Sequence, residues 1–167
     1  LLDYPTGRKV TWPRLTNSIA EVVREFAGNE SCHLFGTSFG SALALETALR
    51  LGSQVQSLTL HSAFAHLPLT TFERAGAGLL RWVPGRIQSL PLWRVLQERA
   101  HRLWFPPIDP TRWLFYLDNA GQTPVAELAR RFAMLGQFDV RSRLQSFETP
   151  TLLLHVEGEG ELQSRCR

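Results

Sequence analysis

A serine bracketed by glycines, Gly36-Thr37-Ser38-Phe39-Gly40, constrains the fold of this chain more than any other stretch. A short apolar run, residues 32–35, precedes it, and an alanine- and leucine-rich segment follows over residues 40–51 and stops at Gly52. The first run is typical of a buried strand and the second of a helix. A strand that turns sharply into a helix lifts the side chain at the turn away from the sheet, so the hydroxyl of Ser38 is expected to be accessible.

The turn predicts chemistry for Ser38, because a serine hydroxyl becomes a nucleophile only where a base can reach it. Glycines at both flanks, Gly36 and Gly40, are expected to remove collisions with the neighbouring backbone. The helix directs free N–H groups and the positive end of its dipole at the serine, and the N–H of Phe39 is the first expected oxyanion donor. The motif also occurs as a polar residue in an ordinary turn, but the strand before it and the helix after it favour the nucleophile.

Helix and strand patterns alternate around the turn. Residues 1–5 read as the end of a strand, and Ser18-Ile19-Ala20-Glu21 has the spacing of a capping box that starts a helix ending at Gly28. Two further apolar runs, residues 55–60 and 151–156, are predicted strands. We therefore predict an α/β fold with a mainly parallel sheet, helices on both faces and a helical insertion.

Three regions follow from this pattern: an α/β core with the turn over residues 1–63, a helical cap insertion over 64–137, and a return to the core over 138–167. Seven prolines break the insertion into short helical pieces, and it is too long for a simple connection. Four of the five tryptophans lie in it, which suits either an apolar ligand or ordinary helix packing.

Composition narrows the function classes. The net charge is +3 and acidic residues are interspersed among the arginines, which favours solvated helix faces over a nucleic-acid partner. No apolar run approaches the roughly 18 residues of a membrane span. The two cysteines, Cys32 and Cys166, and the spacing of the histidines imply neither a metal site nor a cofactor. No stretch resembles a signal peptide and the chain begins with Leu1, so the compartment stays open, with the cytoplasm favoured.

The chain resembles the α/β-hydrolase superfamily over nearly its whole length. The resemblance rests on Leu-Asp-Tyr-Pro at residues 2–5, His-Leu-Phe-Gly-Thr-Ser-Phe-Gly at 33–40, Val-Gln-Ser-Leu-Thr-Leu-His-Ser at 55–62 and Thr-Pro-Thr-Leu-Leu-Leu-His at 149–155. The helical insertion occupies the place of the family's cap. The start and the turn are also similar to maspardin, a member thought to act in protein binding more than in hydrolysis, and Ser41 stands where the family usually has another glycine.

The resemblance implies a triad in the order serine, acid, histidine. Ser38 would be the nucleophile, and Glu159 falls where the family most often has its acid, although the neighbouring glutamates and a solvated acidic terminus remain alternatives. All five histidines precede Glu159. His61, at the end of a predicted strand, is placed either to touch substrate or to pack. The base and the second oxyanion N–H are therefore expected outside these residues, and we expect the chain to be truncated at both ends.

The implied activity is that of a serine hydrolase acting on a small-molecule ester or other acyl substrate in its full-length form. Without a base in the expected position, the 167-residue chain itself is expected to be inactive. The alternative is a non-catalytic protein-binding module of the same fold, as the likeness to maspardin suggests. The two readings differ in the partner they imply, which is an acyl substrate in the first and a protein in the second.

Overall fold

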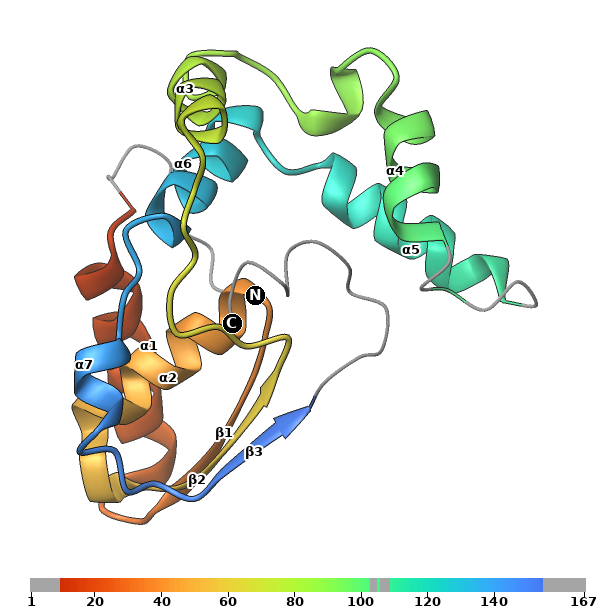
Figure 1. Ribbon diagram of the computed structural model, residues 1–167. Helices are drawn as coiled ribbons and strands as arrows, with labels where there is room; N and C mark the ends of the chain where they lie inside the picture. Colours follow the sequence, from red (N-terminus) through yellow and green to blue (C-terminus); the bar gives the residue numbers. More distant parts are fainter. Residues whose placement is uncertain (1–9, 103–104, 106–108, 155–167) are drawn as a thin grey trace. The chain divides into compact units, whose positions relative to one another are not determined.

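The computed structural model describes residues 10–102, 105 and 109–154 (Figure 1). The predicted strand at residues 1–5 and the candidate acid Glu159 lie outside this range. The chain divides into two compact units: a core unit, Leu1–Leu69 with Met134–Arg167, and a helical unit, Thr70–Ala133. None of the described helices is both long and apolar enough to cross a bilayer.

The core unit contains a parallel sheet of three strands in the order β1 (Cys32–Thr37), β2 (Val55–His61) and β3 (Thr151–Leu154). The register pairs Thr37 with His61 and His61 with Leu154, so the carboxyl ends of all three strands meet at one edge. The predicted parallel sheet is confirmed, and the apolar runs that predicted the strands form it.

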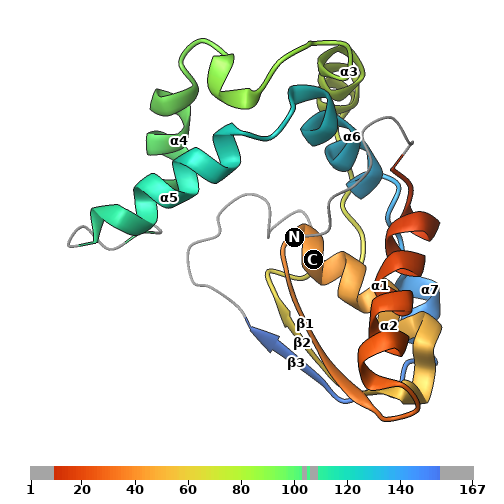
Figure 2. The same ribbon diagram turned by 180° about the vertical axis from the view of Figure 1, so that it is seen from behind.

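The described helices of the core unit lie on one face of the sheet (Figures 1 and 2). They are α1 (Trp12–Ala27), α2 (Phe39–Leu51) and α7 (Arg141–Leu144), with a short 3₁₀ turn, η1 (Gly52–Gln54), after α2. The chain crosses from β1 to β2 and from β2 to β3 in the same direction, and right-handed crossovers in one direction put their helices on the same face. Among the described residues of this unit, the opposite face carries no helix.

The helix α1 begins earlier than its sequence pattern indicates. Thr11 is the N-cap and Ser18 lies inside the helix, so the predicted start at the capping box is wrong. Pro13 fits in the first turn, where its missing N–H leaves no bond unmade. The predicted end is confirmed, because Gly28 adopts a left-handed φ of 57° and its N–H donates to the carbonyl of Arg24.

Tertiary contacts explain the early start of α1. The Trp12 ring stacks on Phe39 at 5.3 Å between centroids and lies 5.0 Å from Phe138. Its indole N–H donates to the carbonyl of Met134 at 2.9 Å. These partners are far from Trp12 in sequence, so they fix the first turn of α1 without leaving a periodic pattern nearby.

The core between α2 and the sheet consists of small helical side chains against larger strand side chains. The α2 face contributes three alanines and a leucine, and β2 contributes fully buried aliphatic residues (Ala42, Ala44, Leu45, Ala48, Leu58, Leu60). Alanine lets the helix axis approach the strands closely. At the other side of α2, Glu46 accepts hydrogen bonds from Arg143 of α7, which raise the pKa of that guanidinium.

The helical unit contains α3 (Thr71–Leu80), η2 (Ile87–Ser89), α4 (Trp93–His101), α5 (Pro110–Gly121) and most of α6 (Val125–Leu135), whose last two residues belong to the core unit. Trp113 is buried against Phe105 and Tyr116, at 5.3 and 5.5 Å between centroids. Burial raises the pKa of Tyr116, whose hydroxyl donates to Gln97. Helix packing therefore accounts for Trp113, one of the four tryptophans of the insertion.

A neck of two short segments, residues 64–69 and 134–140, lies within the core unit where the chain leaves it and returns. The N–H of Val140 donates to the carbonyl of Ala65 at 3.0 Å, and an antiparallel bridge joins His66 to Asp139. A Cβ added at Gly136 would lie 2.7 Å from Cγ of Leu69. The borders of the helical unit thus lie a few residues inside the predicted insertion, and its role as a cap stays a prediction.

Two buried threonines of the core unit give a test of its packing. Thr47 on α2 is fully buried and its hydroxyl has no hydrogen-bond partner among the described residues, whereas the hydroxyl of buried Thr16 donates to the carbonyl of Trp12 at 2.9 Å. Thr47→Val is expected to raise the free energy of unfolding by about 1 kcal/mol, because it removes an unpaired polar atom, and Thr16→Val to lower it by about 1 kcal/mol. Urea unfolding monitored by circular dichroism measures both, and a loss at Thr47 equal to that at Thr16 would contradict the packing described.

Candidate functional site

Ser38 occupies the turn between β1 and α2 in a strained backbone conformation. It is the N-cap of α2 with φ 52° and ψ −119°, and its side chain is exposed. For a residue with a Cβ, a left-handed φ of this kind costs on the order of 1–3 kcal/mol and is found mainly where the surroundings enforce it. The hydroxyl is thus presented at the edge where the strands end.

Hydrogen bonds fix both backbone groups of Ser38. Its N–H donates to the carbonyl of His61 on β2 at 3.0 Å. Its carbonyl accepts from the N–H of Ser41 at 2.9 Å and from the Ser41 hydroxyl at 2.6 Å. Ser41 is buried, so this hydroxyl gives the turn a bond that a glycine at the same place would lack. Its position in the first turn of α2 was the only sequence signal for this role.

The two glycines of the motif differ in what they do. A Cβ at Gly36 would lie 2.7 Å from the carbonyl carbon of Gly40 and 2.7 Å from Cα of Ser41, so β1 and α2 approach as closely as glycine allows. A Cβ at Gly40 would have no described atom within 4 Å apart from those of its chain neighbours and its own helix. The expected collision is therefore confirmed at Gly36 and is wrong at Gly40, which supplies the backbone that Gly36 must avoid.

Phe39 is the first residue of α2, and helices leave their first N–H groups without an intrahelical acceptor. Its ring stacks on Trp12, which anchors the start of the helix to α1. The backbone N–H of Phe39 thus follows the serine on a fixed segment, with the positive end of the α2 dipole beside it.

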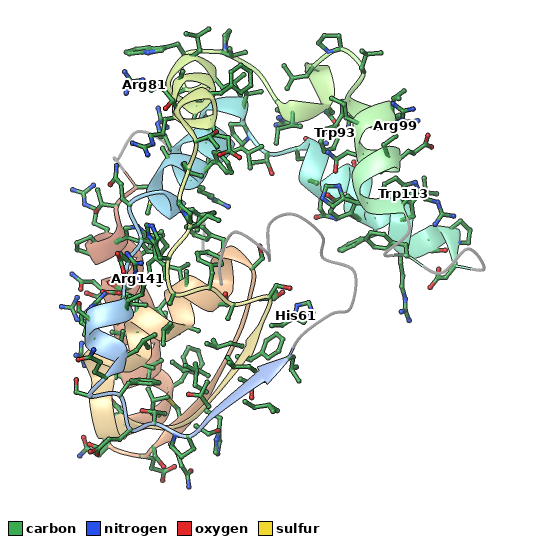
Figure 3. All side chains as sticks on the ribbon, in the orientation of Figure 1. His61, Arg81, Trp93, Arg99, Trp113 and Arg141 are labelled. Atoms are coloured by element: carbon green, nitrogen blue, oxygen red, sulfur yellow. The ribbon has the colours of Figure 1, made fainter. Side chains whose placement is uncertain are left out.

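His61 lies at the end of β2, half-buried and paired in register with Thr37 (Figure 3). Its Nδ1 is 2.9 Å from the Thr37 hydroxyl and 3.4 Å from that of Ser62. Ser62 has a left-handed φ of 53°, and its N–H donates to the carbonyl of Leu154. Thr37, His61 and Ser62 thus cluster at the edge that carries Ser38. The sequence does not single out Thr37 or Ser62; the strand register brings Thr37 to His61, and Ser62 follows His61 directly in the chain.

The other described histidines have partners away from the serine turn. Nδ1 of His33 is 2.7 Å from the Ser57 hydroxyl, and Nδ1 of His66 is 3.2 Å from the carbonyl of Phe138. His101 belongs to the helical unit, where burial lowers its pKa. Within the described ranges, no side chain forms a hydrogen bond with the hydroxyl of Ser38. The same ranges contain no group of three His, Cys, Asp or Glu side chains that could hold a metal ion.

The carboxylate of Asp139, beside His66 in the neck, is held in its charged form by its neighbours. The side chain of Arg141 donates two hydrogen bonds to this carboxylate, one of them at 3.0 Å from Nε. These bonds hold the pKa of Asp139 far below its usual range. His66 Nδ1 is 3.8 Å from the same carboxylate, which marks this histidine as part of the neck.

The parallel sheet, the strained serine at a strand end and the helix that follows define the α/β-hydrolase fold, and comparison with solved structures gives the same result. The chain is similar to MenH from S. aureus, with a TM-score of 0.75 and 16% identity over 98% of this chain and 64% of that one. It is also similar to a hydrolase from Pseudomonas aeruginosa, with a TM-score of 0.66 and 21% identity over 87% of this chain and 54% of the other.

A lipase-esterase related protein from Clostridium acetobutylicum matches with a TM-score of 0.70 and 14% identity over 98% of this chain. The chain spans between 54% and 65% of the length of these three structures. No protein-family model and no curated protein matches the sequence. At these identities the likeness shows the fold, and two of the three neighbours are described as a hydrolase and as a lipase-esterase related protein.

The glycines of the turn give a matched pair of substitutions. Gly36→Ala is expected to lower the free energy of unfolding by about 3 kcal/mol or more, because backbone atoms rather than flexible side chains would meet the new methyl group. Gly40→Ala is expected to leave it unchanged or raise it by up to about 1 kcal/mol, since alanine favours the helix. Urea unfolding of the two variants compares them, and equal losses would show that the strand and helix are not in such close contact.

Proposed function

We propose that the complete protein is a serine hydrolase that acts on an ester or another acyl substrate, with Ser38 as its nucleophile. The backbone of Ser38 carries this proposal: an exposed non-glycine residue has a φ of 52° and is held there through both its N–H and its carbonyl. Strain that the surroundings maintain is typical of functional positions. The hydrolases among the structures with this fold support the reaction class.

In the proposed reaction, Oγ of Ser38 attacks the acyl carbon and passes its proton to a histidine, and the carbonyl oxygen becomes an oxyanion. The N–H of Phe39 donates to that oxyanion at the start of α2. The histidine then protonates the leaving group as the carbon–oxygen bond breaks, and water hydrolyses the acyl-enzyme. Glu159 orients the histidine, which in the family order comes after the acid.

His61 is proposed to contact the substrate. Within the described part of the chain, its side-chain hydrogen bonds are made by Nδ1, to the hydroxyls of Thr37 and Ser62. This arrangement holds the ring and leaves Nε2 for a polar atom of the acyl group or of the leaving group.

A protein-binding module without catalysis is the second candidate. The observation that favours it is the hydroxyl of Ser38, which no described side chain engages, so an activating base is not part of the described site. In this case the strained turn would be a feature inherited with the fold, and a protein would replace the acyl substrate as partner.

Labelling of the full-length protein separates the two candidates. A fluorophosphonate probe is expected to label the wild-type protein, and Ser38→Ala is expected to abolish labelling and lower hydrolysis of a p-nitrophenyl ester by roughly three orders of magnitude or more. Ser53→Ala, at an exposed serine of η1, is the control and should leave both signals unchanged. Background signals from the wild type and Ser38→Ala alike would favour the binding module.

The 167-residue chain alone is expected to give no turnover above that of its Ser38→Ala variant. Without a positioned proton acceptor, a serine hydroxyl loses several orders of magnitude in rate. The same p-nitrophenyl ester assay tests this. Turnover that depends on Ser38 would contradict the expectation and would mean that one of the five histidines serves as base, with His61→Gln as the first variant to test.

A further inference from the structure

We propose that α3 and the turn after it bind the surface of an anionic lipid bilayer. This lipid-binding segment, residues 71–86, carries three large apolar side chains that are among the most exposed of the described residues. Phe72 is 86% exposed, Leu79 78% and Trp82 77%. A contiguous exposed apolar patch is uncommon on a soluble surface and marks an interaction site.

The three side chains share one side of the segment. Phe72 and Leu79 are seven residues apart, which is nearly two helical turns. The chain continues in helical turns past Leu80, because Trp82 N–H donates to the carbonyl of Leu79 and Val83 N–H to that of Leu80, both at 3.1 Å. Trp82 thus extends the row that Phe72 and Leu79 begin. In both views α3 lies beside α6 of the same unit (Figures 1 and 2). The exposed fractions show that Phe72, Leu79 and Trp82 face solvent.

A capping box closes the N-terminal end of the segment. Thr70 accepts from the N–H of Glu73 at 3.2 Å, and the Glu73 carboxylate accepts from the N–H of Thr70 at 2.7 Å. This capping box starts α3 at Thr71. It also occupies Glu73, the only carboxylate among residues 71–86.

Cations flank the apolar row. The segment contains Arg74, Arg81 and Arg86. The guanidinium of Arg81 lies 5.2 Å from the centroid of the Trp82 ring, at the end of α3 (Figure 3). The whole helical unit, residues 70–133, has nine arginines and no lysine against five acidic residues, which gives it a net charge of +4. A surface of this sign attracts anionic headgroups, and each cation near them contributes about 1 kcal/mol, or roughly fivefold in affinity.

The side-chain chemistry favours a lipid surface over a protein. Residues 71–86 contain no Ser, Asn, Gln, Tyr or His, so Thr71 and the charged groups are the only polar side chains. Protein interfaces carry a regular complement of hydrogen bonds, about one per 100–200 Å², and this segment offers few groups to make them. Aromatic and aliphatic side chains beside arginine match the boundary between acyl chains and headgroups. The inference does not depend on the proposed hydrolase activity.

Co-sedimentation of the full chain with vesicles tests the proposal. We expect binding to phosphatidylcholine vesicles that contain about one third phosphatidylserine, and weak binding to phosphatidylcholine alone. The double variant Phe72→Ser/Leu79→Ser should lower the partition coefficient on the order of tenfold or more. Phe26→Ser is the matched control, because Phe26 is 84% exposed on α1 of the core unit, and it should leave binding unchanged.

The cationic part of the surface is tested separately. Arg81→Gln is expected to lower binding to anionic vesicles about fivefold, and raising the salt concentration should weaken the wild type in the same way. Arg99→Gln is the control, because it removes the same charge from an exposed arginine of α4 in the same unit. It should change the logarithm of the partition coefficient by less than about half as much as Arg81→Gln does.

Three outcomes would overturn the proposal: no binding to anionic vesicles, equal losses for Phe26→Ser and the double variant, or a dimer by size-exclusion chromatography that the double variant dissociates. The last would identify the segment as an interface between copies of the chain. Circular dichroism checks that each variant is folded. If the double variant does not fold, quenching of wild-type fluorescence by brominated lipid, with Trp82→Phe as reference, decides: equal quenching in the two proteins rejects insertion of Trp82.

Discussion

The close approach of β1 to the start of α2 is the constraint on which the rest of the core unit depends. It exists because Gly36 has no side chain, so the backbone of Gly40 and Ser41 can lie directly against the strand. The turn between them has room for only one residue in an unfavourable conformation, and that residue is Ser38. Bonds from Ser38 to β2 and to Ser41 offset the strain, since each contributes roughly 1 kcal/mol and together they match its cost.

The same approach determines how the helices are arranged. A helix that begins so near the strand can run along the sheet only with small side chains between them, and alanines of α2 fill this position. Trp12 then joins α1 to the first residue of α2 and to Phe138, so three segments distant in sequence are held around the beginning of one helix. The serine turn is therefore rigid because it lies at the junction of α1, α2 and the sheet.

The sequence predicts those elements that local residue patterns determine. The apolar runs of β1, β2 and β3 are long enough to identify, and Gly28 and Gly52 mark helix ends through their left-handed φ. It failed where distant contacts decide the outcome. The start of α1 depends on Met134 and Phe138, and the contact between Thr37 and His61 depends on strand register. The motif predicts a steric role for both glycines, but among the described residues only Gly36 is crowded, since a motif shows which positions are glycine without showing how close other atoms lie. Glu159 lies outside the described residues.

The neck allows the helical unit to vary in length with little effect on the core unit. Because the bond from Val140 to Ala65 and the bridge between His66 and Asp139 already close the loop, the entropy of bringing its ends together is met inside the core unit. Each doubling of the enclosed length then costs only about 0.6 kcal/mol, so helices can be added or removed beyond the neck at little expense to the sheet. Whatever the helical unit recognises can change over evolutionary time while Gly36, Ser38 and Ser41 keep their geometry.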